Sequence, residues 1–427
     1  MTKLLTLNTM IEKGDLDERL LDIYVSEKRV RREKDRLIKA LRRFNEIFGS
    51  DAPVEIYSAP GRSEICGNHT DHQHGQVLAA SISDDAIAVV SKTDDNTVSV
   101  LSEGYDMITI SLDDLSRESF KEGTTNALIA GVLARTRDLD HSIGGFNAYI
   151  TSDVLSGSGL SSSAAFETII GTILSGLYND MKISPIEIAM IGQFAENVFF
   201  GKPCGLMDQM ACSVGSLCHI DFADPQNPVV EKIEFDLEKA GYNLCITDTK
   251  GSHADLTDDY AAVPFEMSSV AALFGKDVLN ELSENEIIFG ADRIRKECGD
   301  RAFLRAVHFY EENRRVEKET AALKNGDMAS FLENIRLSGD SSFKYLQNVY
   351  TNHDITHQNV SVALMISQLV LGNNGVARVH GGGFAGTIQA FVKKEAVPSY
   401  RAAMDRLLGE GSCNVLMIRK YGGIRIL

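Results

Sequence analysis

The feature that most constrains the fold of this chain is a glycine- and serine-rich segment, SGSGLSSSAAFE, at residues 156–167. It follows an alternating stretch typical of a strand, FNAYITSDV, and opens a helical run that continues to about residue 180. Its glycines let backbone N–H groups approach a ligand closely, and a helix start directs unpaired N–H groups toward the same point. The segment therefore predicts a phosphate-binding loop between a strand and a helix.

Other phosphate-binding patterns do not fit this segment. A Rossmann fingerprint requires GxGxxG, but Ser162 stands where the last glycine belongs. A P-loop requires Gly-Lys followed by Ser or Thr, and no Gly-Lys pair in the sequence has that continuation. Taken alone, the segment is also compatible with a plain Ser-Gly loop that caps a helix.

Two further stretches indicate a ligand site. RVHGGGFAGTIQAF, at 378–391, places three glycines between strand-like segments, which suggests positive φ, a backbone passing against a bulky group, or a tight turn. GQFAENVFFGKPCGLMDQMACSVG, at 192–215, puts Glu196 in an apolar helix and Asp208 just after a glycine-containing turn. A buried carboxylate must be paired, protonated or metal-bound, so both are candidate functional groups.

Length and composition bound the remaining possibilities. The 427 residues are enough for two domains. The net charge of −17 is spread along the chain and argues against nucleic acid and membranes as partners. The seven cysteines form no CxxC pair, and the first residues lack the apolar core of a signal peptide. We therefore expect a cytoplasmic protein.

The order of helix and strand patterns predicts an α+β protein. A helix is expected over 26–49 and a long one over 302–325, whereas GRSEICGNHTDHQHG, at 61–75, fits neither pattern and predicts a turn. Strands are expected at 54–60, 76–82, 85–92, 97–103, 146–154, 243–249, 376–384, 386–394 and 413–420. We predict an extension over 1–25, a domain of mixed sheet and helices over 26–225 and a second domain over 226–427, with the boundary in the proline-containing segment 222–232.

Three motifs together resemble those of a known family. GRSEICGNHTD (61–71), GSGLSSSAA (157–165) and GGGFAG (381–386) are similar to the three motifs of the GHMP small-molecule kinases. The set most resembles galactokinases, with patterns GRxNxxGEHTD, GLSSSA and GGGFGG, and GKPCGLMDQM resembles their stretch with the catalytic aspartate. The resemblance covers residues 28–427 and implies a ferredoxin-like second domain and ATP-dependent phosphorylation of galactose at its anomeric hydroxyl.

The resemblance also implies the site residues. Asp208 would accept the proton of the anomeric hydroxyl, with Arg62 beside it. The sugar would contact Asn68, His69, Thr70, Asp71, Gly205 and Tyr260. The ATP phosphates would lie in a loop of Gly157, Ser158, Gly159, Leu160, Ser161, Ser162 and Ser163. Mg²⁺ would be held by Ser163 and Glu196, whose oxygens suit a hard cation. The expected partners are thus the sugar and ATP, and we expect a monomer, although the sequence does not fix the oligomeric state.

Departures from the family pattern leave the substrate open. Asn68 stands where galactokinases carry glutamate, and His72-Gln73 replaces Tyr-Asn. A neutral amide tolerates a C6 carboxylate better than a glutamate does, because like charges in a closed pocket repel. DHQ is also similar to a turn of plant galacturonate kinases, and Lys202 could supply a positive field. Galactose is therefore the first expectation and galacturonate the second. Leu155 replaces a proline before the second motif and Ala385 a glycine in the third, and neither change removes a reacting group.

Three alternatives of other kinds remain. A sugar sensor derived from a kinase would bind without turnover, but the second motif is intact here. A mevalonate or homoserine kinase would share the glycine-serine loop but lack HTD and PCGLMDQ. A zinc cluster could use His69, His72 and His74 with Asp71, although three ligands within six residues rarely converge, and His72 and His74 are more readily interpreted as surface-turn residues.

Overall fold

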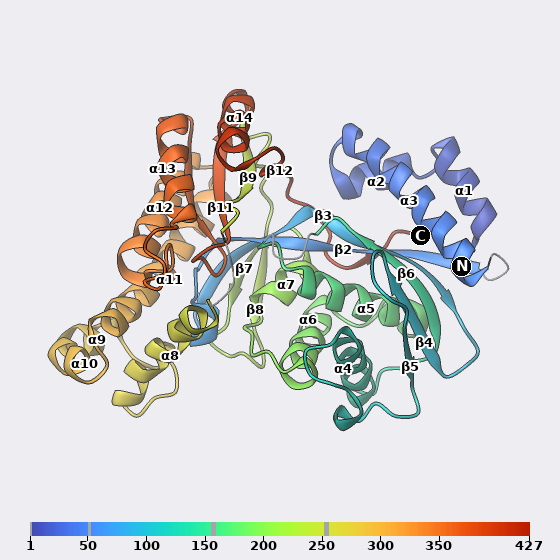
Figure 1. Cartoon of the computed structure of the whole chain (residues 1–427), viewed down its shortest axis with the longest axis horizontal. Helices are drawn as coiled ribbons and strands as arrows, with labels where there is room; N and C mark the ends of the chain where they lie inside the picture. Colours follow the sequence, from blue (N-terminus) through green and yellow to red (C-terminus); the bar gives the residue numbers. More distant parts are fainter. Residues whose placement is uncertain (1, 50–52, 155–158, 252–255) are drawn as a thin grey trace.

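The structure of the chain is a computed structural model that describes residues 2–49, 53–154, 159–251 and 256–427. In the described part, the strands form two sheets, one of nine strands and one of four, with helices around both (Figure 1). The predicted α+β architecture is therefore confirmed. No helix in these ranges combines the length and the apolar composition needed to cross a bilayer.

The first sheet is mixed, as predicted. Its central path runs β1-β2-β3-β6-β4-β5, with β13 on β2 and with β7 and β8 extending from β3. Only β4 and β6 pair in parallel among the described strands. The strands are β1 (Thr2–Lys3), β2 (Pro53–Cys66), β3 (Gln76–Lys92), β4 (Thr97–Ser102), β5 (Ile108–Ser111), β6 (Phe146–Ser152), β7 (Leu217–Asp221), β8 (Val229–Ile233) and β13 (Ile424–Arg425).

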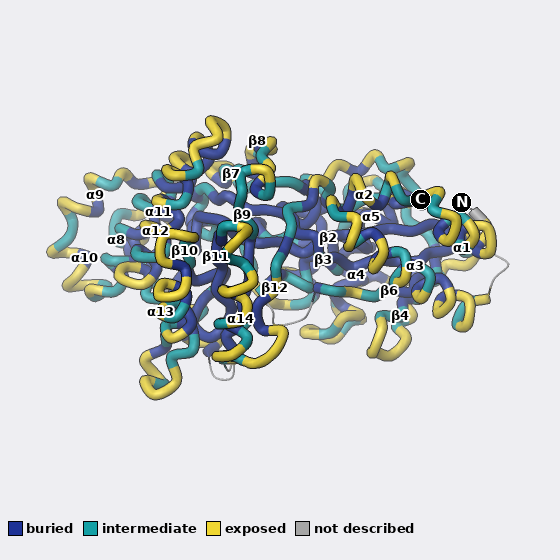
Figure 2. Tube along the Cα trace, turned by 90° about the horizontal axis from the view of Figure 1, so that it is seen from above, coloured by how far each residue is buried: buried dark blue, intermediate teal, exposed yellow. Residues whose placement is uncertain are grey.

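Strands β2 and β3 are longer than the sequence suggested. The predicted strands at 76–82 and 85–92 form the single strand β3, and β2 continues through residues 61–66, where a turn was expected. Both strands are buried along nearly their whole length, and exposed residues gather on turns and outer helices (Figure 2). The polar residues that interrupt the strand pattern are therefore satisfied inside the protein instead of by solvent at a turn.

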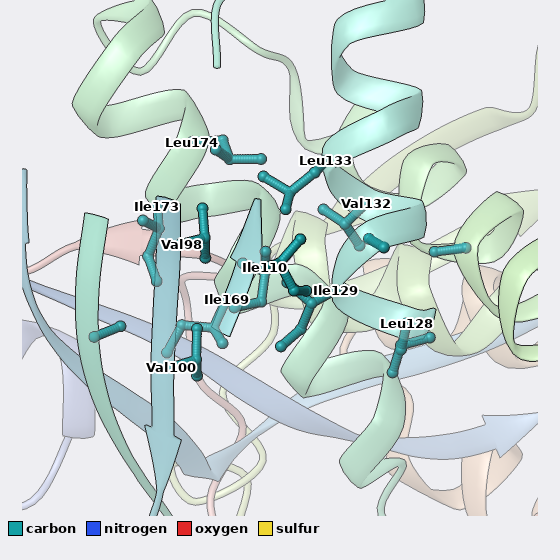
Figure 3. Packing of buried hydrophobic residues seen from close by; sticks show 14 of the residues in the cluster. Val98, Val100, Ile110, Leu128, Ile129, Val132, Leu133, Ile169, Ile173 and Leu174 are labelled. Atoms are coloured by element: carbon teal, nitrogen blue, oxygen red, sulfur yellow. The ribbon is translucent and has the colours of Figure 1, made fainter. Parts of the chain in front are cut away.

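Helices cover both faces of the first sheet. They are α1 (Leu4–Lys13), α2 (Asp17–Tyr24), α3 (Glu27–Phe48), η1 (Asp71–Gln73), η2 (Arg117–Ser119), α4 (Thr125–Asp138), α5 (Ser162–Asn179), α6 (Pro185–Phe194), η3 (Ala195–Phe200) and α7 (Met207–Val214). On one face, Ile129 of α4 and Ile169 of α5 pack against Val100 of β4 (Figure 3). On the other face, α1–α3 pack through residues such as Leu37 and Phe44 (Figure 1).

The second sheet has the order β10-β11-β9-β12, and its described pairs are all antiparallel. With a helical segment after β9 and α14 before β12, this is the ferredoxin-like arrangement expected from the resemblance. Its elements are β9 (Tyr242–Asp248), α8 (Thr257–Leu273), η4 (Leu279–Glu281), α9 (Glu284–Phe289), α10 (Ala291–Glu297), α11 (Asp300–Lys324), α12 (Met328–Ser341), η5 (Ser342–Leu346), α13 (Asn359–Leu371), β10 (Gly375–His380), β11 (Thr387–Lys393), η6 (Lys394–Ala396), α14 (Val397–Leu408) and β12 (Cys413–Leu416).

The chain crosses the predicted domain boundary twice. Strand β8 begins in the segment predicted as a linker and still belongs to the first sheet, and β13, at the end of the chain, pairs with β2. The division at residue 225 stays a prediction.

A buried aspartate in β3 ties distant segments together. Asp85 accepts hydrogen bonds from Tyr24 Oη at 2.7 Å and from Arg419 Nη1 at 2.9 Å, and Arg36 also binds it. Asp85 and Arg419 are both fully buried. Burial opposes the charge on Asp85, but the two arginines outweigh it and hold its pKa below the ordinary value. The N-terminal helices and the C-terminal segment are thus fixed to β3 at one point.

We predict that Asp85→Asn destabilises the protein by roughly 3–5 kcal/mol, because it removes one charge of a buried network and leaves the buried Arg419 without its carboxylate partner. Urea unfolding at pH 7 measures the loss, with Asp94→Asn, at an exposed position, as the matched control. A loss below about 1 kcal/mol for Asp85→Asn, as for an exposed pair, would contradict this account.

Candidate active site

The centre of the site is an ion pair between Arg62 of β2 and Asp208 in the first turn of α7. Arg62 Nε lies 2.7 Å from Asp208 Oδ1 and Nη2 lies 2.9 Å from Oδ2. Arg62 is 8% exposed and Asp208 is 34% exposed, so the carboxylate still faces solvent. Burial opposes its charge, but Arg62 outweighs this and holds the pKa of Asp208 below the ordinary value. Asp208 is therefore an ionised, rigidly held carboxylate at neutral pH.

The glycine-serine loop lies directly beside this pair. Arg62 Nη1 donates to the Gly159 carbonyl, and Ser161 Oγ donates to Asp208. Gly159 has φ +70°, and a Cβ there would lie 2.5 Å from Thr387 Oγ1, so this position requires glycine. Of the predicted loop, Gly157 and Ser158 lie outside the described residues.

Helix α5 begins at the end of this loop. Its N-cap Ser161 makes no side-chain capping bond, because its hydroxyl is turned to Asp208. Leu160 precedes it, and Ser162 and Ser163 form the first turn. The N–H groups of that turn lack a side-chain cap and carry the positive end of the helix dipole, which suits an anion.

Glu196 and Ser163 converge next to the loop. Ser163 Oγ lies 3.4 Å from Glu196 Oε1, which also accepts from Lys202 Nζ at 2.9 Å. Gln209 holds the other carboxylate oxygen at 2.8 Å. Glu196 lies in η3, a π-helical turn after α6, and such turns are frequent at functional sites. A hydroxyl and a carboxylate oxygen at this spacing are a donor set that Mg²⁺ accepts.

A pocket of about 230 Å³ opens in front of Asp208. Six of the predicted residues line it, namely Arg62, His69, Asp71, Gly205, Asp208 and Tyr260. Its wall also includes Glu64, His72, Cys204, Met207, Pro264, Gly381 and Gly382. The lining therefore combines the first motif, the segment before α7, the start of α8 and the glycine triplet.

Asp71 and Gly205 are packed against each other in the pocket wall. A Cβ at position 205 would lie 1.8 Å from Asp71 Oδ2, so the carboxylate occupies the space that the glycine leaves. The backbone N–H of His72 donates to Asp71 Oδ1 at 2.9 Å. Burial, followed by the charge of Asp208, raises the pKa of Asp71 to about 6. No arginine or lysine forms an ion pair with Asp71 among the described residues.

Two aromatic groups border the glycine triplet. His69 Nε2 lies 3.2 Å from the Gly382 carbonyl, and burial lowers the pKa of His69 to about 4, so the neutral ring donates this bond. Tyr260 Oη donates to the Gly383 carbonyl at 3.0 Å. Gly381 and Gly383 both have positive φ, as the glycine pattern suggested.

Asn68 and Thr70 do not line the pocket, although sugar contacts were predicted for them. Both are fully buried. Asn68 Nδ2 donates to Glu64 Oε1 at 2.9 Å and to the Gly381 carbonyl at 2.7 Å, and Asn68 Oδ1 accepts from Asn348 Nδ2 at 2.8 Å. Thr70 Oγ1 bonds the Gly67 carbonyl at 2.9 Å. Their polar side-chain atoms are thus hydrogen-bonded within the protein and are not part of the pocket wall.

Sequence reasoning missed Glu64 and misplaced His72. Both line the pocket, His72 from the short turn η1, where it is half-buried; burial lowers the pKa of His72 to about 3, so its ring is neutral. The signal for Glu64 was in the first motif, because the pattern GRxNxxGEHTD has asparagine at position 64 and glutamate at 68, and this chain has the reverse. The zinc interpretation fails, since the described residues form no group of three metal-ligating side chains.

Comparisons with known proteins agree with this geometry. Residues 42–92 match the galactokinase galactose-binding signature and residues 127–216 match the GHMP kinases N terminal domain. Galactokinases of Streptomyces coelicolor and Glaesserella parasuis are 30% and 31% identical to the chain, covering 85% and 84% of it and 90% of each relative.

Solved structures share the fold. Lactococcus lactis galactokinase complexed with galactose has a TM-score of 0.78 at 24% identity and covers 91% of this chain and 100% of its own. A mevalonate kinase has a TM-score of 0.60 at 15% identity, with 86% of this chain and 99% of its own covered. The matched GHMP domain and the galactokinase relatives, together with the two-sheet fold and the glycine-serine loop beside Arg62 and Asp208, define a GHMP kinase, a phosphotransferase.

Within that class, identity of 30% over most of both chains is decisive, and the chain belongs to the galactokinase family. Mevalonate kinase shares the fold alone, at 15% identity, whereas galactokinases reach 30%, so the mevalonate or homoserine kinase alternative is wrong.

The pKa of Asp71 leads to a stability prediction. A carboxyl group whose folded pKa is raised stabilises the fold below its unfolded pKa, and this contribution is lost as the pH rises through about 6. We therefore expect Asp71→Asn to stabilise the protein at pH 8 relative to wild type, with a gain that shrinks by about 1–2 kcal/mol at pH 5. Urea unfolding at both pH values measures this, with Asp138→Asn on the exposed surface of α4 as control. An equal gain in the free energy of unfolding at the two pH values would contradict a raised pKa for Asp71.

Proposed function

We propose that the chain transfers the γ-phosphoryl group of ATP to the anomeric hydroxyl of galactose, giving galactose 1-phosphate and ADP. The observation that carries the proposal is the Arg62–Asp208 pair, which faces a sugar-sized pocket on one side and the start of α5 on the other. The galactokinases among the relatives and the galactose bound to the Lactococcus lactis protein support the choice of sugar.

Asp208 is the proposed general base. Its carboxylate accepts the proton of the anomeric hydroxyl as that oxygen attacks the γ-phosphorus, and the bond from phosphorus to the ADP oxygen breaks. Arg62 keeps Asp208 ionised and places positive charge beside the transferred group. Because phosphoryl transfer depends mainly on positioning and charge stabilisation, these two side chains supply most of what the protein must contribute at the acceptor.

The phosphate side of the site uses the backbone. We propose that residues 157–163 surround the ATP phosphates, with the first N–H groups of α5 directed at them. Ser163 and Glu196 would hold Mg²⁺, which neutralises phosphate charge when bound. Lys202, which now bonds Glu196, adds positive charge at the same place. The seven free cysteines agree with the proposed cytoplasmic location.

We predict that Asp208→Asn lowers kcat by roughly 10²–10⁴-fold, because the amide cannot take the proton. The Kd for galactose should change by only a few fold, since the shape of the residue is kept. Coupled ADP release and calorimetry measure the two effects, and Asp138→Asn is the matched control. Galactose binding by the wild type without ADP release would instead support the sensor alternative.

A second prediction concerns the metal. Glu196→Gln should raise the Mg²⁺ concentration for half-maximal rate about tenfold, because a neutral amide is a weaker ligand for a hard cation. The KM for galactose should stay unchanged, since Glu196 does not line the sugar pocket. A Mg²⁺ titration at fixed ATP measures this. An unchanged Mg²⁺ requirement would exclude Glu196 as a ligand.

A further inference from the structure

Glu64 is a pocket carboxylate for which the proposed reaction has no use. It lies two residues after Arg62 on β2, and residues two apart on a strand share a face. Both side chains line the same pocket. Glu64 is nevertheless 4% exposed, so what little surface it has belongs to that pocket. Burying a carboxylate costs free energy, so a buried carboxylate in a pocket wall indicates a specific role.

The two oxygens of Glu64 have different surroundings. Oε1 accepts from Asn68 Nδ2 at 2.9 Å and from Arg378 Nη2 at 3.0 Å. Oε2 has no hydrogen bond to any described residue. Unlike the buried unpaired atoms elsewhere in the described chain, it can be reached by solvent. One oxygen therefore anchors the carboxylate, and the other remains an acceptor open to the pocket.

The anchor is rigid. Arg378 of β10 is fully buried. Its Nη1 also donates to the carbonyl of Ile65, the neighbour of Glu64 on β2, at 2.7 Å. Asn68 is held from both sides by Gly381 and Asn348. Because both partners are buried and also bonded to neighbouring backbone carbonyls, the direction of Oε2 is fixed before any ligand binds, which lowers the entropic cost of a hydrogen bond to it.

The charges facing the pocket are mainly negative. Glu64, Asp71 and Asp208 contribute carboxylates, whereas Arg62 is the one lysine or arginine among the described lining residues, and it is bonded to Asp208. His69 is neutral. Lys202, which could have favoured a sugar acid, bonds Glu196 and does not line the pocket. A sugar carboxylate would find no free cation there.

From this arrangement we propose that Glu64 determines substrate specificity, with Oε2 accepting a hydrogen bond from a hydroxyl of the sugar away from the anomeric carbon, so that the pocket selects neutral hexoses and rejects sugar acids. This inference rests on the proposed function. It reverses the argument from Asn68, because the neutral amide at 68 lies outside the pocket and the carboxylate at 64 takes its place in the wall.

The test compares wild type with Glu64→Gln, with galactose and galacturonate as substrates and ATP as the donor. The assay runs at pH 8, because burial raises the pKa of Glu64 to about 7 and the ionised form is wanted. We expect wild type to favour galactose in kcat/KM by at least about 10³-fold. Glu64→Gln should raise the KM for galactose about tenfold. It should also lower the galactose-to-galacturonate ratio of kcat/KM about tenfold or more, since the repulsion between the Glu64 and galacturonate carboxylates is lost.

Glu312→Gln is the matched control. Glu312 is also a buried carboxylate bound to the first motif, through the N–H groups of Gly67 and Asn68, but it does not line the pocket. If Glu64 merely held the motif in place, both variants would affect the two sugars in the same proportion. We expect only Glu64→Gln to change the galactose-to-galacturonate ratio. If that variant unfolds, Glu64→Asp, which keeps the charge but shortens its reach, should raise the KM for galactose while galacturonate stays excluded.

Two results would overturn the inference, namely wild-type kcat/KM for galacturonate at or above that for galactose, or an unchanged ratio in Glu64→Gln. Failure of the proposed function looks different, because no hexose would then be phosphorylated by wild type. In that case calorimetry gives the Kd values of both sugars for wild type and Glu64→Gln. A galactose-to-galacturonate ratio of Kd that changes in Glu64→Gln supports the role of Glu64, and an unchanged ratio overturns it.

Discussion

The ion pair between Arg62 and Asp208 is the interaction on which the site depends. Its two members come from segments 146 residues apart, one on the long strand β2 and one at the start of α7. The same guanidinium reaches the Gly159 carbonyl, and the same carboxylate receives the Ser161 hydroxyl. Strand, loop and helix are therefore held together by one partly buried pair, and the uncapped start of α5 is placed beside the carboxylate.

A second set of contacts fixes the two sheets to each other at the pocket. Gln389 Nε2 of β11 donates to the Glu64 carbonyl at 2.7 Å, and His380 Nε2 of β10 lies 3.1 Å from Ser63 Oγ. The glycine triplet follows β10 directly, and a Cβ at Gly383 would lie 2.0 Å from the Asn348 carbonyl. The triplet thus packs closely against the segment that follows η5, and the pocket owes its shape to a junction that cannot move far without breaking these bonds.

Sequence patterns predicted the features that depend on residues close together in the chain. Helical spacing predicted α3 and α11, and the glycine-serine pattern placed a strand, loop and helix in the right order, because these depend on residues near one another. The motifs also brought Arg62 and Asp208 together. The single strand β3 was split at Ser83 and Asp84, which resemble turn residues, and the burial of the adjacent Asp85 depends on arginines 49 and 334 positions away. Asn68 was assigned to the pocket for a similar reason, since its orientation is set by Asn348 in the second half of the chain.

The three pocket carboxylates show how one small cavity separates chemical roles. Arg62 can neutralise only one of them, and Asp208, which it binds with two hydrogen bonds, has a lowered pKa. Burial raises the pKa of Asp71 and of Glu64, to about 6 and about 7. Groups of the same kind with pKa values moved apart indicate a division of labour. In the proposed reaction, the carboxylate that Arg62 binds is ready to accept a proton, whereas Asp71 and Glu64, the latter anchored by Arg378, are held in place as hydrogen-bond partners for a ligand that supplies hydroxyl groups.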